Sequence, residues 1–185
     1  LLTPEVQRLR EVRLINTTTP HLAALSDTRR YTHTVGVLAL ALRVAPRLTG
    51  RFSREEIDGL LIAAVLHDVG TPPFAHLFEY LLKADSGWTH EGMLKNIVAG
   101  SYRPEGRYHQ LYFGNELALH KVLKSRPAET EIALGYVEGR GPLASLIAGS
   151  LDLDNIDNVY RMCSLLGFRP DLGDALRLVD GIGVG

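Results

Sequence analysis

Apolar residues recur at intervals of three and four along most of this 185-residue chain, which is the spacing of amphipathic helices. A first helix is expected to begin at Pro4, because proline suits the first turn of a helix. A second is expected from a cap at Ser26 or Asp27 to about Ala45, where Pro46 would end it. Its apolar stripe consists of Val37, Leu40, Ala41 and Val44.

The rest of the chain continues the helical pattern. Ser53 and Glu56 match a capping box, and the helix behind them is expected to stop near Gly70. Thr89 is a candidate cap for a later helix. Further helices are expected over 72–83, 89–98, 115–124, 127–137, 142–149 and 153–166, with loops over 16–27 and 100–114. Because no segment alternates with a period of two, the pattern predicts one all-α domain over residues 1–185, or the N-terminal or core part of a longer chain.

Composition narrows the functional classes. Hydrophobic residues make up 45% of the chain and charged residues 22%, as in ordinary globular proteins, and the net charge is −1. This balance argues against a membrane surface or a broad nucleic-acid surface, while nucleic acid stays open as an effector. Cys163 is the single cysteine, so no internal disulfide can form, and a reducing, cytoplasmic setting is expected.

The stretch "LHDVGTPPFAH", residues 66–76, carries the first candidate chemistry. Side chains of adjacent helical residues point about 100° apart, so His67 and Asp68 can hold one ion only at a helix end. The Gly70–Pro73 turn supplies such an end. Imidazole and carboxylate together suit a divalent ion such as Mn²⁺, Fe²⁺ or Zn²⁺.

Two ligands rarely hold a catalytic metal, so other residues have to converge on this pair. His33 stands on the long second helix, and "SLDLDNIDNVYR" supplies Asp152, Asp154 and Asp157. Asp154 and Asp157 are three positions apart and share a helix face. Each residue also has a plainer interpretation, since Asp152 can be a helix cap and Asp157 can pair with Arg161 four positions later.

The sequence around these residues resembles a known family. "RRYTHTVGVLALAL", "AAVLHDVGTPPFAHLFE" and "LDLDNIDNVYR" are similar to the HD-domain phosphohydrolases, specifically the deoxynucleoside triphosphate triphosphohydrolase (dGTPase-like) branch. "TPEVQRLREVRLI" and "WTHE" are weaker matches. The resemblance implies an all-α HD-domain helical bundle with a central metal site. It also implies that one divalent ion (Mn, Fe, Zn, Ni or Mg) is held by His33, His67, Asp68 and Asp154.

The same resemblance implies that His76 and Glu79 are the catalytic pair. The two are three positions apart, so a helix from Pro73 puts both on one face, where the carboxylate can orient the imidazole. The substrate site is implied to include Arg30, His90, Glu91 and Asp157. For Arg30, a solvated charge beside Arg29 is an equal alternative.

Four positions depart from the family pattern. Thr71 stands where many relatives carry His or Asn, and Asn155 fills a position that is basic in some members. Asn158 replaces a Tyr, and Met162 replaces an Asp. These changes leave the implied metal ligands intact but leave the substrate open.

The resemblance therefore predicts metal-assisted hydrolysis of a nucleotide, with a dNTP yielding a deoxynucleoside and triphosphate. Arginine side chains of the 100–114 loop would help to offset the phosphate charge. One alternative is an HD phosphohydrolase of a nucleoside monophosphate, a cyclic nucleotide or another phosphorylated metabolite. Another is a non-catalytic nucleotide-binding or assembly module with a structural metal. A homo-oligomer is expected.

Overall fold

The computed structural model describes residues 1–15, 27–73, 75–102 and 117–183, and the side chains of residues 75–77 lie outside this description. The described part is all-helical, with two isolated bridges and no sheet. The α-helices are α1 (Pro4–Gln7), α2 (Arg30–Leu48), α3 (Arg54–Leu66), α4 (Ala75–Ser86), α5 (His90–Val98), α7 (Leu119–Leu123), α8 (Pro127–Val137), α9 (Leu153–Leu165) and α10 (Leu172–Gly181). Two 3₁₀ helices join them, η1 (Arg8–Arg10) and η3 (Ala144–Leu146).

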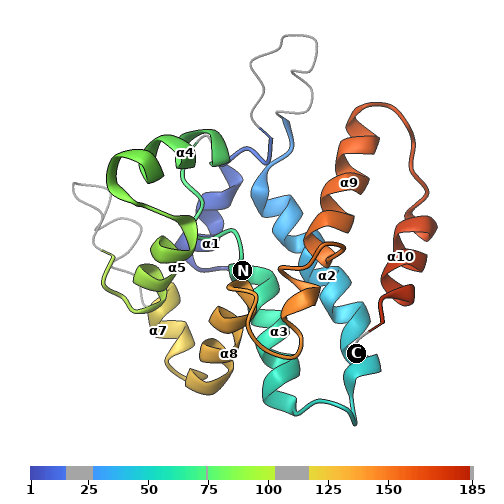
Figure 1. Ribbon diagram of the computed structural model, residues 1–185, viewed down its shortest axis with the longest axis horizontal. Helices are drawn as coiled ribbons and strands as arrows, with labels where there is room; N and C mark the ends of the chain where they lie inside the picture. Colours follow the sequence, from blue (N-terminus) through green and yellow to red (C-terminus); the bar gives the residue numbers. More distant parts are fainter. Residues whose placement is uncertain (16–26, 74, 103–116, 184–185) are drawn as a thin grey trace.

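Helices α2 and α3 form the centre of the fold. Figure 1 shows α9 and α10 on one side of this pair and α4 and α5 on the other. Helix α3 also packs against α8, and α2 packs against α9. The segments that carry the candidate ligands, in α2, at the end of α3 and at the start of α9, therefore meet in the middle of the molecule.

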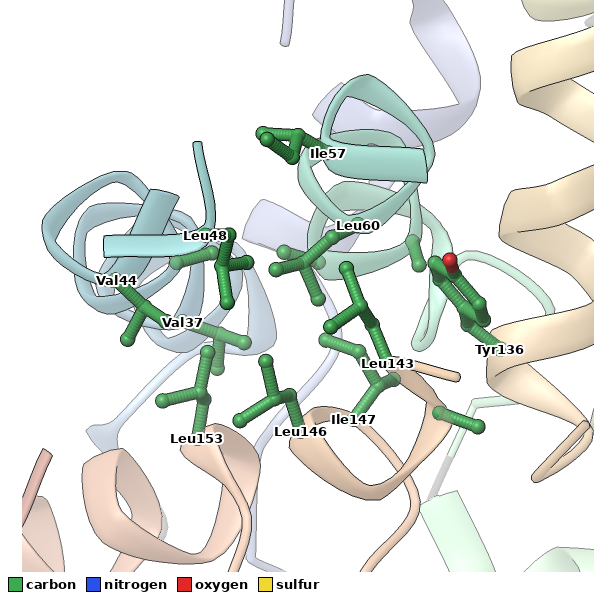
Figure 2. Close-up of a cluster of buried hydrophobic side chains, with 14 of the residues drawn as sticks. Val37, Val44, Leu48, Ile57, Leu60, Tyr136, Leu143, Leu146, Ile147 and Leu153 are labelled. Carbon is green, nitrogen blue, oxygen red and sulfur yellow. The ribbon is translucent and has the colours of Figure 1, made fainter. Parts of the chain in front are cut away.

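One hydrophobic cluster joins α2, α3, α8, η3, α9 and α10. Figure 2 shows Val37 and Leu60 facing Leu146 and Leu153 across this cluster. These four side chains are almost completely shielded from solvent, and burial of each such side chain contributes about 1.5–3 kcal/mol. The cluster holds the start of α9 against α2, one turn away from His33.

A second cluster lies on the other side of α3. It joins α1 and η1 to α5 and α7 and includes Leu66 and Val69, the residues that flank the His67–Asp68 pair. Because Val37 belongs to the first cluster and Leu66 to the second, the candidate ligands lie where the two clusters adjoin.

The helix caps predicted at Ser53, Thr89 and Asp152 are confirmed, whereas the cap predicted at Ser26 or Asp27 is wrong because Arg29 is the N-cap residue of α2. Ser53 and Glu56 form the reciprocal capping box at the start of α3. The Thr89 side chain accepts a hydrogen bond from the Gly92 N–H, and α5 begins at the next residue. Asp152 caps α9 in the same way, accepting from the Asn155 N–H at 2.7 Å.

Helix α2 differs from the prediction at both ends. It begins at Arg30, because an extended residue, Arg29, precedes it and is bridged to Arg13. At its other end it continues through Pro46 to Leu48. Proline has no N–H, so Pro46 cannot donate a hydrogen bond to the carbonyl of Leu42. Leu42 is exposed, so water can bond that carbonyl instead.

Two other elements correct the sequence-based expectation. The helix expected over 142–149 is only the short η3, because the following Gly149 N–H donates to the Asp152 carboxylate at 2.9 Å and draws the chain into the cap of α9. Helix α10 was not among the expected helices; it begins at a cap formed by Asp171. The loops expected over 16–27 and 100–114 fall mostly outside the described residues.

No helix in the described ranges has the length and apolar character that crossing a membrane would require.

Candidate metal centre

The His67–Asp68 pair stands at the end of α3, where the chain turns sharply. His67 is the C-cap residue of α3, and its N–H still donates to Ala63. The turn is fastened by a bond from the Thr71 N–H to the Asp68 carbonyl at 3.0 Å. Arg8 donates to the carbonyls of Val69 and Thr71, each at 2.8 Å. His67 keeps helical dihedral angles, and at this end of α3 its Nε2 lies 3.5 Å from Asp68 Oδ2.

Glycine is required inside this turn for a steric reason. A Cβ on Gly70 would lie 2.0 Å from the carbonyl oxygen of His90, the first residue of α5. Gly70 therefore lets the start of α5 touch the turn, which brings His90 and Glu91 to the same cavity as His67 and Asp68.

The imidazole rings of His33 and His67 approach each other through their Nε2 atoms, and the Nδ1 atom of each ring forms a hydrogen bond on the opposite side. The Nδ1–H of His67 donates to the Ala64 carbonyl at 3.0 Å, and the Nδ1–H of His33 donates to Asp157 Oδ2 at 2.7 Å. The two Nε2 atoms are 3.4 Å apart. With a proton on Nδ1, each ring can present Nε2 to a metal, as metal-ligating histidines require, and at His33 the ion would displace the proton that Nε2 shares with Asp154.

Two carboxylates complete the cluster, one from the same turn as His67 and one from α9. Asp68 Oδ2 lies 3.5 Å from His67 Nε2 and 3.9 Å from His33 Nε2. Asp154 Oδ1, from the first turn of α9, lies 2.7 Å from His33 Nε2. Asp68 Oδ2 is buried, and no group among the described residues forms a hydrogen bond with it. A buried carboxylate oxygen without such a partner, facing two Nε2 atoms, fits a divalent cation.

The ionisation of the cluster shows carboxylates held in their charged form around a His33 ring that a metal ion would have to deprotonate. Burial alone would lower the pKa of His33, but hydrogen bonds to Asp154 and Asp157 and the charge of Asp68 raise it to about 9. Burial opposes ionisation of Asp68, yet the charges of His67, Arg30 and His33 hold the pKa of Asp68 below its ordinary value. Burial likewise opposes ionisation of Asp154, and its hydrogen bond to His33 lowers the pKa of that carboxyl. The carboxylates therefore stay charged and favour a cation at their centre.

A cavity of about 560 Å³ opens from the ligand cluster. Its polar lining includes Arg30, His90, Glu91 and Asn158. Its apolar lining consists of Leu14, Ile15, Val137, Ile147, Ala148, Gly149 and Met162. This volume is sufficient for a small organic molecule, so a ligand in it would lie directly beside the ligand cluster.

A second His–carboxylate group consists of Glu79 on α4 and of His90 and Glu91 on α5, and the latter two line this cavity. Glu79 Oε1 accepts from His90 twice, from the backbone N–H at 3.1 Å and from Nδ1 at 2.7 Å. Glu91 Oε1 lies 3.5 Å from His90 Nε2. The sequence placed His90 at the site but did not indicate that Glu79 pairs with it. The expected pairing of Glu79 with His76 involves a side chain outside the described residues.

Arg30 and Asp157 occupy places that refine the sequence-based interpretation. Arg30 is buried rather than solvated, and its Nη1 pairs with Asp68 Oδ1 at the edge of the cavity. Asp157 is not part of the described cavity lining and stands behind the His33 ring instead. No signal in the local sequence indicates this pairing, because the two residues are 124 positions apart.

The four positions that depart from the family pattern lie in three places: the cavity, a groove between α9 and α10, and the turn beside Asp68. Asn158 and Met162 line the cavity, as expected, one and two turns after Asp154 on α9. Asn155 is exposed and lines a groove between α9 and α10 instead of the cavity. Thr71 is buried and donates to Asp68 Oδ1 at 3.1 Å.

Comparison with known proteins places these residues in a family. The sequence profile of the HD domain matches residues 30–160. The uncharacterized protein YwfO of Bacillus subtilis is 30% identical over 164 residues, covering 86% of this chain and 34% of its own length. The deoxynucleoside triphosphate triphosphohydrolase SAMHD1 of Bos taurus is 25% identical, covering 90% of this chain and 32% of its own length. The chain thus spans about a third of these two relatives.

Solved structures show the same fold. A phosphohydrolase from Bacteroides thetaiotaomicron superposes with a TM-score of 0.67 at 18% identity, covering 96% of this chain and 40% of that protein. A hypothetical protein from Aquifex aeolicus superposes with a TM-score of 0.70 at 22% identity, covering 96% of this chain and 44% of that one. At these identities the likeness concerns the fold.

Proposed function

This chain belongs to the HD-domain family, and we propose that it is the metal-binding part of a phosphohydrolase that acts on nucleotides. The observation that carries the proposal is the convergence of His33, His67 and Asp68, with Asp154 Oδ1 at 2.7 Å from His33 Nε2. These residues would hold one divalent ion through two Nε2 atoms and two carboxylates. The mixture of nitrogen and oxygen donors suits Mn²⁺, Fe²⁺ or Zn²⁺ better than Mg²⁺.

When bound, such an ion supplies Lewis-acid polarisation of a phosphate oxygen and lowers the pKa of a coordinated water. The protein's own groups supply the remaining functions. Arg30, at the cavity edge beside Asp68, is placed to bind a phosphate oxygen through its guanidinium donors. His33 and His67 are held in one tautomer by Asp157 and Ala64, so their ligand atoms need no reorientation.

His90 is the described imidazole best placed to move a proton at the cavity. Glu79 accepts hydrogen bonds from Nδ1 and from the backbone N–H of His90, which fixes the ring with Nε2 3.5 Å from Glu91 Oε1. We assign to His90 Nε2 the exchange of a proton with the reacting groups. The corresponding role of His76, implied by family resemblance, stays a prediction.

Within this class, hydrolysis of a dNTP to a deoxynucleoside and triphosphate is the specific reaction that we propose. It is supported by the resemblance to SAMHD1, whose name states that activity, over 90% of this chain. A homo-oligomeric assembly also stays a prediction.

One observation favours a phosphomonoester as the alternative substrate. Among the described residues that line the cavity, Asp68, Glu91, Asp152 and Asp154 are acidic, whereas Arg30 is the one arginine and no lysine occurs. A triphosphate would bring more negative charge to this lining than a monophosphate would. The expected contribution of arginines in the 100–114 loop concerns residues that lie mostly outside the described part of the chain.

Product analysis separates these reactions. The purified protein, loaded in turn with Mn²⁺, Fe²⁺ and Zn²⁺, would be incubated with dNTPs, NTPs and nucleoside monophosphates and the products resolved by ion-exchange chromatography. Triphosphate release supports the leading proposal, and inorganic phosphate from a monophosphate supports the alternative. Binding of nucleotide without turnover under any metal would refute both and favour a non-catalytic module.

A matched pair of variants ties any turnover to this site. Asp154→Asn removes a proposed ligand, whereas Asp171→Asn keeps a good N-cap on α10 away from the cavity. Turnover has to disappear in the first variant and persist in the second.

A further inference from the structure

Behind the metal centre, away from the cavity, a carboxylate is clamped between an imidazole and a guanidinium. Asp157 Oδ2 accepts from His33 Nδ1 at 2.7 Å and from Arg161 Nε at 2.5 Å. Its other oxygen, Oδ1, accepts from Arg161 Nη2 at 3.1 Å. Arg161 therefore grips both oxygens of Asp157 as a planar fork, which leaves the carboxylate one orientation in which it can also serve His33.

The same guanidinium is fastened to the helix that carries the ligand. Arg161 Nη2 donates to the carbonyl of Thr32 at 2.8 Å, and Thr32 directly precedes His33. Arg161 stands on α9 and Thr32 on α2, so one side chain fixes the distance between the two helices that supply His33 and Asp154.

The sequence of α2 makes room for this clamp. A Cβ on Gly36 would lie 1.9 Å from Asp157 Oδ1 and 2.5 Å from Arg161 Nη2. Glycine is unfavourable in the middle of a helix, so its use three residues after His33 needs a compensating reason. The reason is that the Asp157–Arg161 pair occupies the space that a side chain at position 36 would need.

Burial distinguishes the clamp from an ordinary ion pair on a helix surface. The Asp157 side chain is 8% exposed and that of Arg161 is 23% exposed. By contrast, Arg54 and Asp58 form an Arg–Asp pair with the same i,i+4 spacing on α3, and the Arg54 side chain is 83% exposed. Exposed pairs of that kind contribute little, which makes Arg54 a matched control.

We propose that Arg161 is a positioning residue of the metal centre: it orients Asp157, which in turn holds His33 with Nδ1 protonated and Nε2 directed at the metal. This assignment rests on the proposed metal site, but it concerns affinity for the ion and does not require that the protein hydrolyse any particular substrate. It also gives Asp157 a role behind the ligand rather than in contact with the substrate.

The proposal is tested by titrating the metal-free full chain with Mn²⁺ and with Zn²⁺ by calorimetry. Loss of a partner behind a metal ligand typically weakens metal binding about 10-fold to 100-fold, and Arg161→Gln is expected near the lower end of that range. Asp157→Asn is expected near the upper end, because an amide N–H can donate to Nδ1 and stabilise the wrong tautomer. Arg54→Gln is expected to bind metal as the unaltered protein does.

A second readout separates positioning from general loss of stability. In the Zn²⁺-loaded protein, ¹⁵N-edited NMR of the histidine side chains is expected to show one slowly exchanging Nδ1–H for His33, with Nε2 bound to the metal. In Arg161→Lys, which keeps the charge but loses the fork, that proton signal is expected to shift and exchange faster while the melting curve stays cooperative.

Three outcomes overturn the proposal. Equal metal affinity in Arg161→Gln and Arg54→Gln would show an ordinary ion pair, and an unchanged His33 signal in Arg161→Lys would show that the fork does not set the tautomer. Absence of metal binding by the unaltered protein would remove this proposal together with the proposed function. Metal binding without hydrolysis would remove the proposed function alone, since the affinity comparison still stands.

Discussion

Gly70→Ala is the substitution whose effect can be worked out most fully from the structure. The new Cβ would stand 2.0 Å from the His90 carbonyl oxygen and 2.9 Å from the Leu94 nitrogen. Both are backbone atoms of α5, so no flexible side chain can move aside to accommodate it. Ordinary contact begins near 3.4 Å, and the turn and α5 therefore have to separate by about 1.4 Å.

This separation predicts two effects of different size. Overpacking at a buried position costs about 1–3 kcal/mol of unfolding free energy. A displacement of about 1 Å between groups that act together can lower the rate about 100-fold. His90 moves with α5, whereas the turn that carries His67 and Asp68 is held by the end of α3 and by the two hydrogen bonds from Arg8. Turnover is therefore expected to fall by about two orders of magnitude in Gly70→Ala while metal affinity changes much less.

The assay combines thermal unfolding, calorimetric metal titration and hydrolysis measured with the substrate that the screen identifies. Gly181→Ala is the control, because no atom lies within 4 Å of the position its Cβ would take. If Gly70→Ala retained the activity and the melting temperature of the control, the close approach of the turn to α5 would not matter, and the role assigned to His90 would be refuted.

Three further predictions concern the ligands and the fold. Asp154→Asn is expected to lose stoichiometric metal in elemental analysis, while Asp171→Asn retains it, because only the former faces His33 Nε2. Addition of the metal at about 100 times its Kd is expected to stabilise the metal-free protein by about 2.7 kcal/mol, a rise in melting temperature of roughly 5–11 °C in calorimetry. If the melting temperature did not rise on addition of the metal, a metal centre that forms only in the folded protein would be contradicted. Ser53→Ala, which removes the capping box of α3, is expected to cost about 0.5–2 kcal/mol in chemical denaturation, and metal affinity is expected to stay unchanged.

The parts of the fold that local chemistry determines could be predicted from the sequence. The caps at Ser53, Thr89 and Asp152 each use a side chain within three residues of its partner, so the motif itself contains the interaction. The end of α2 and the short η3 could not be predicted in the same way. Helix α2 can continue through Pro46 because Leu42 is exposed, and η3 stays short because Gly149 donates a hydrogen bond to Asp152. Both conditions are set by tertiary structure.

The candidate site shows the same division. Sequence indicated the HD turn and the residues that converge on it, because motif spacing and family resemblance identify them. It did not indicate that Glu79 pairs with His90 or that Asp157 stands behind His33, since these contacts join segments that only folding brings together. The i,i+4 pairing of Asp157 with Arg161 was foreseen as a plain helix ion pair, but its burial against Gly36 was not.

The most direct test of the central account is a crystal structure of the metal-loaded protein, with anomalous scattering recorded at the absorption edge of the bound element. The account predicts one strong peak between His33 Nε2, His67 Nε2 and the carboxylates of Asp68 and Asp154, at ligand distances of about 2.0–2.3 Å. A fully loaded protein with its peak elsewhere, or with Asp154 turned away from the histidines, would contradict it.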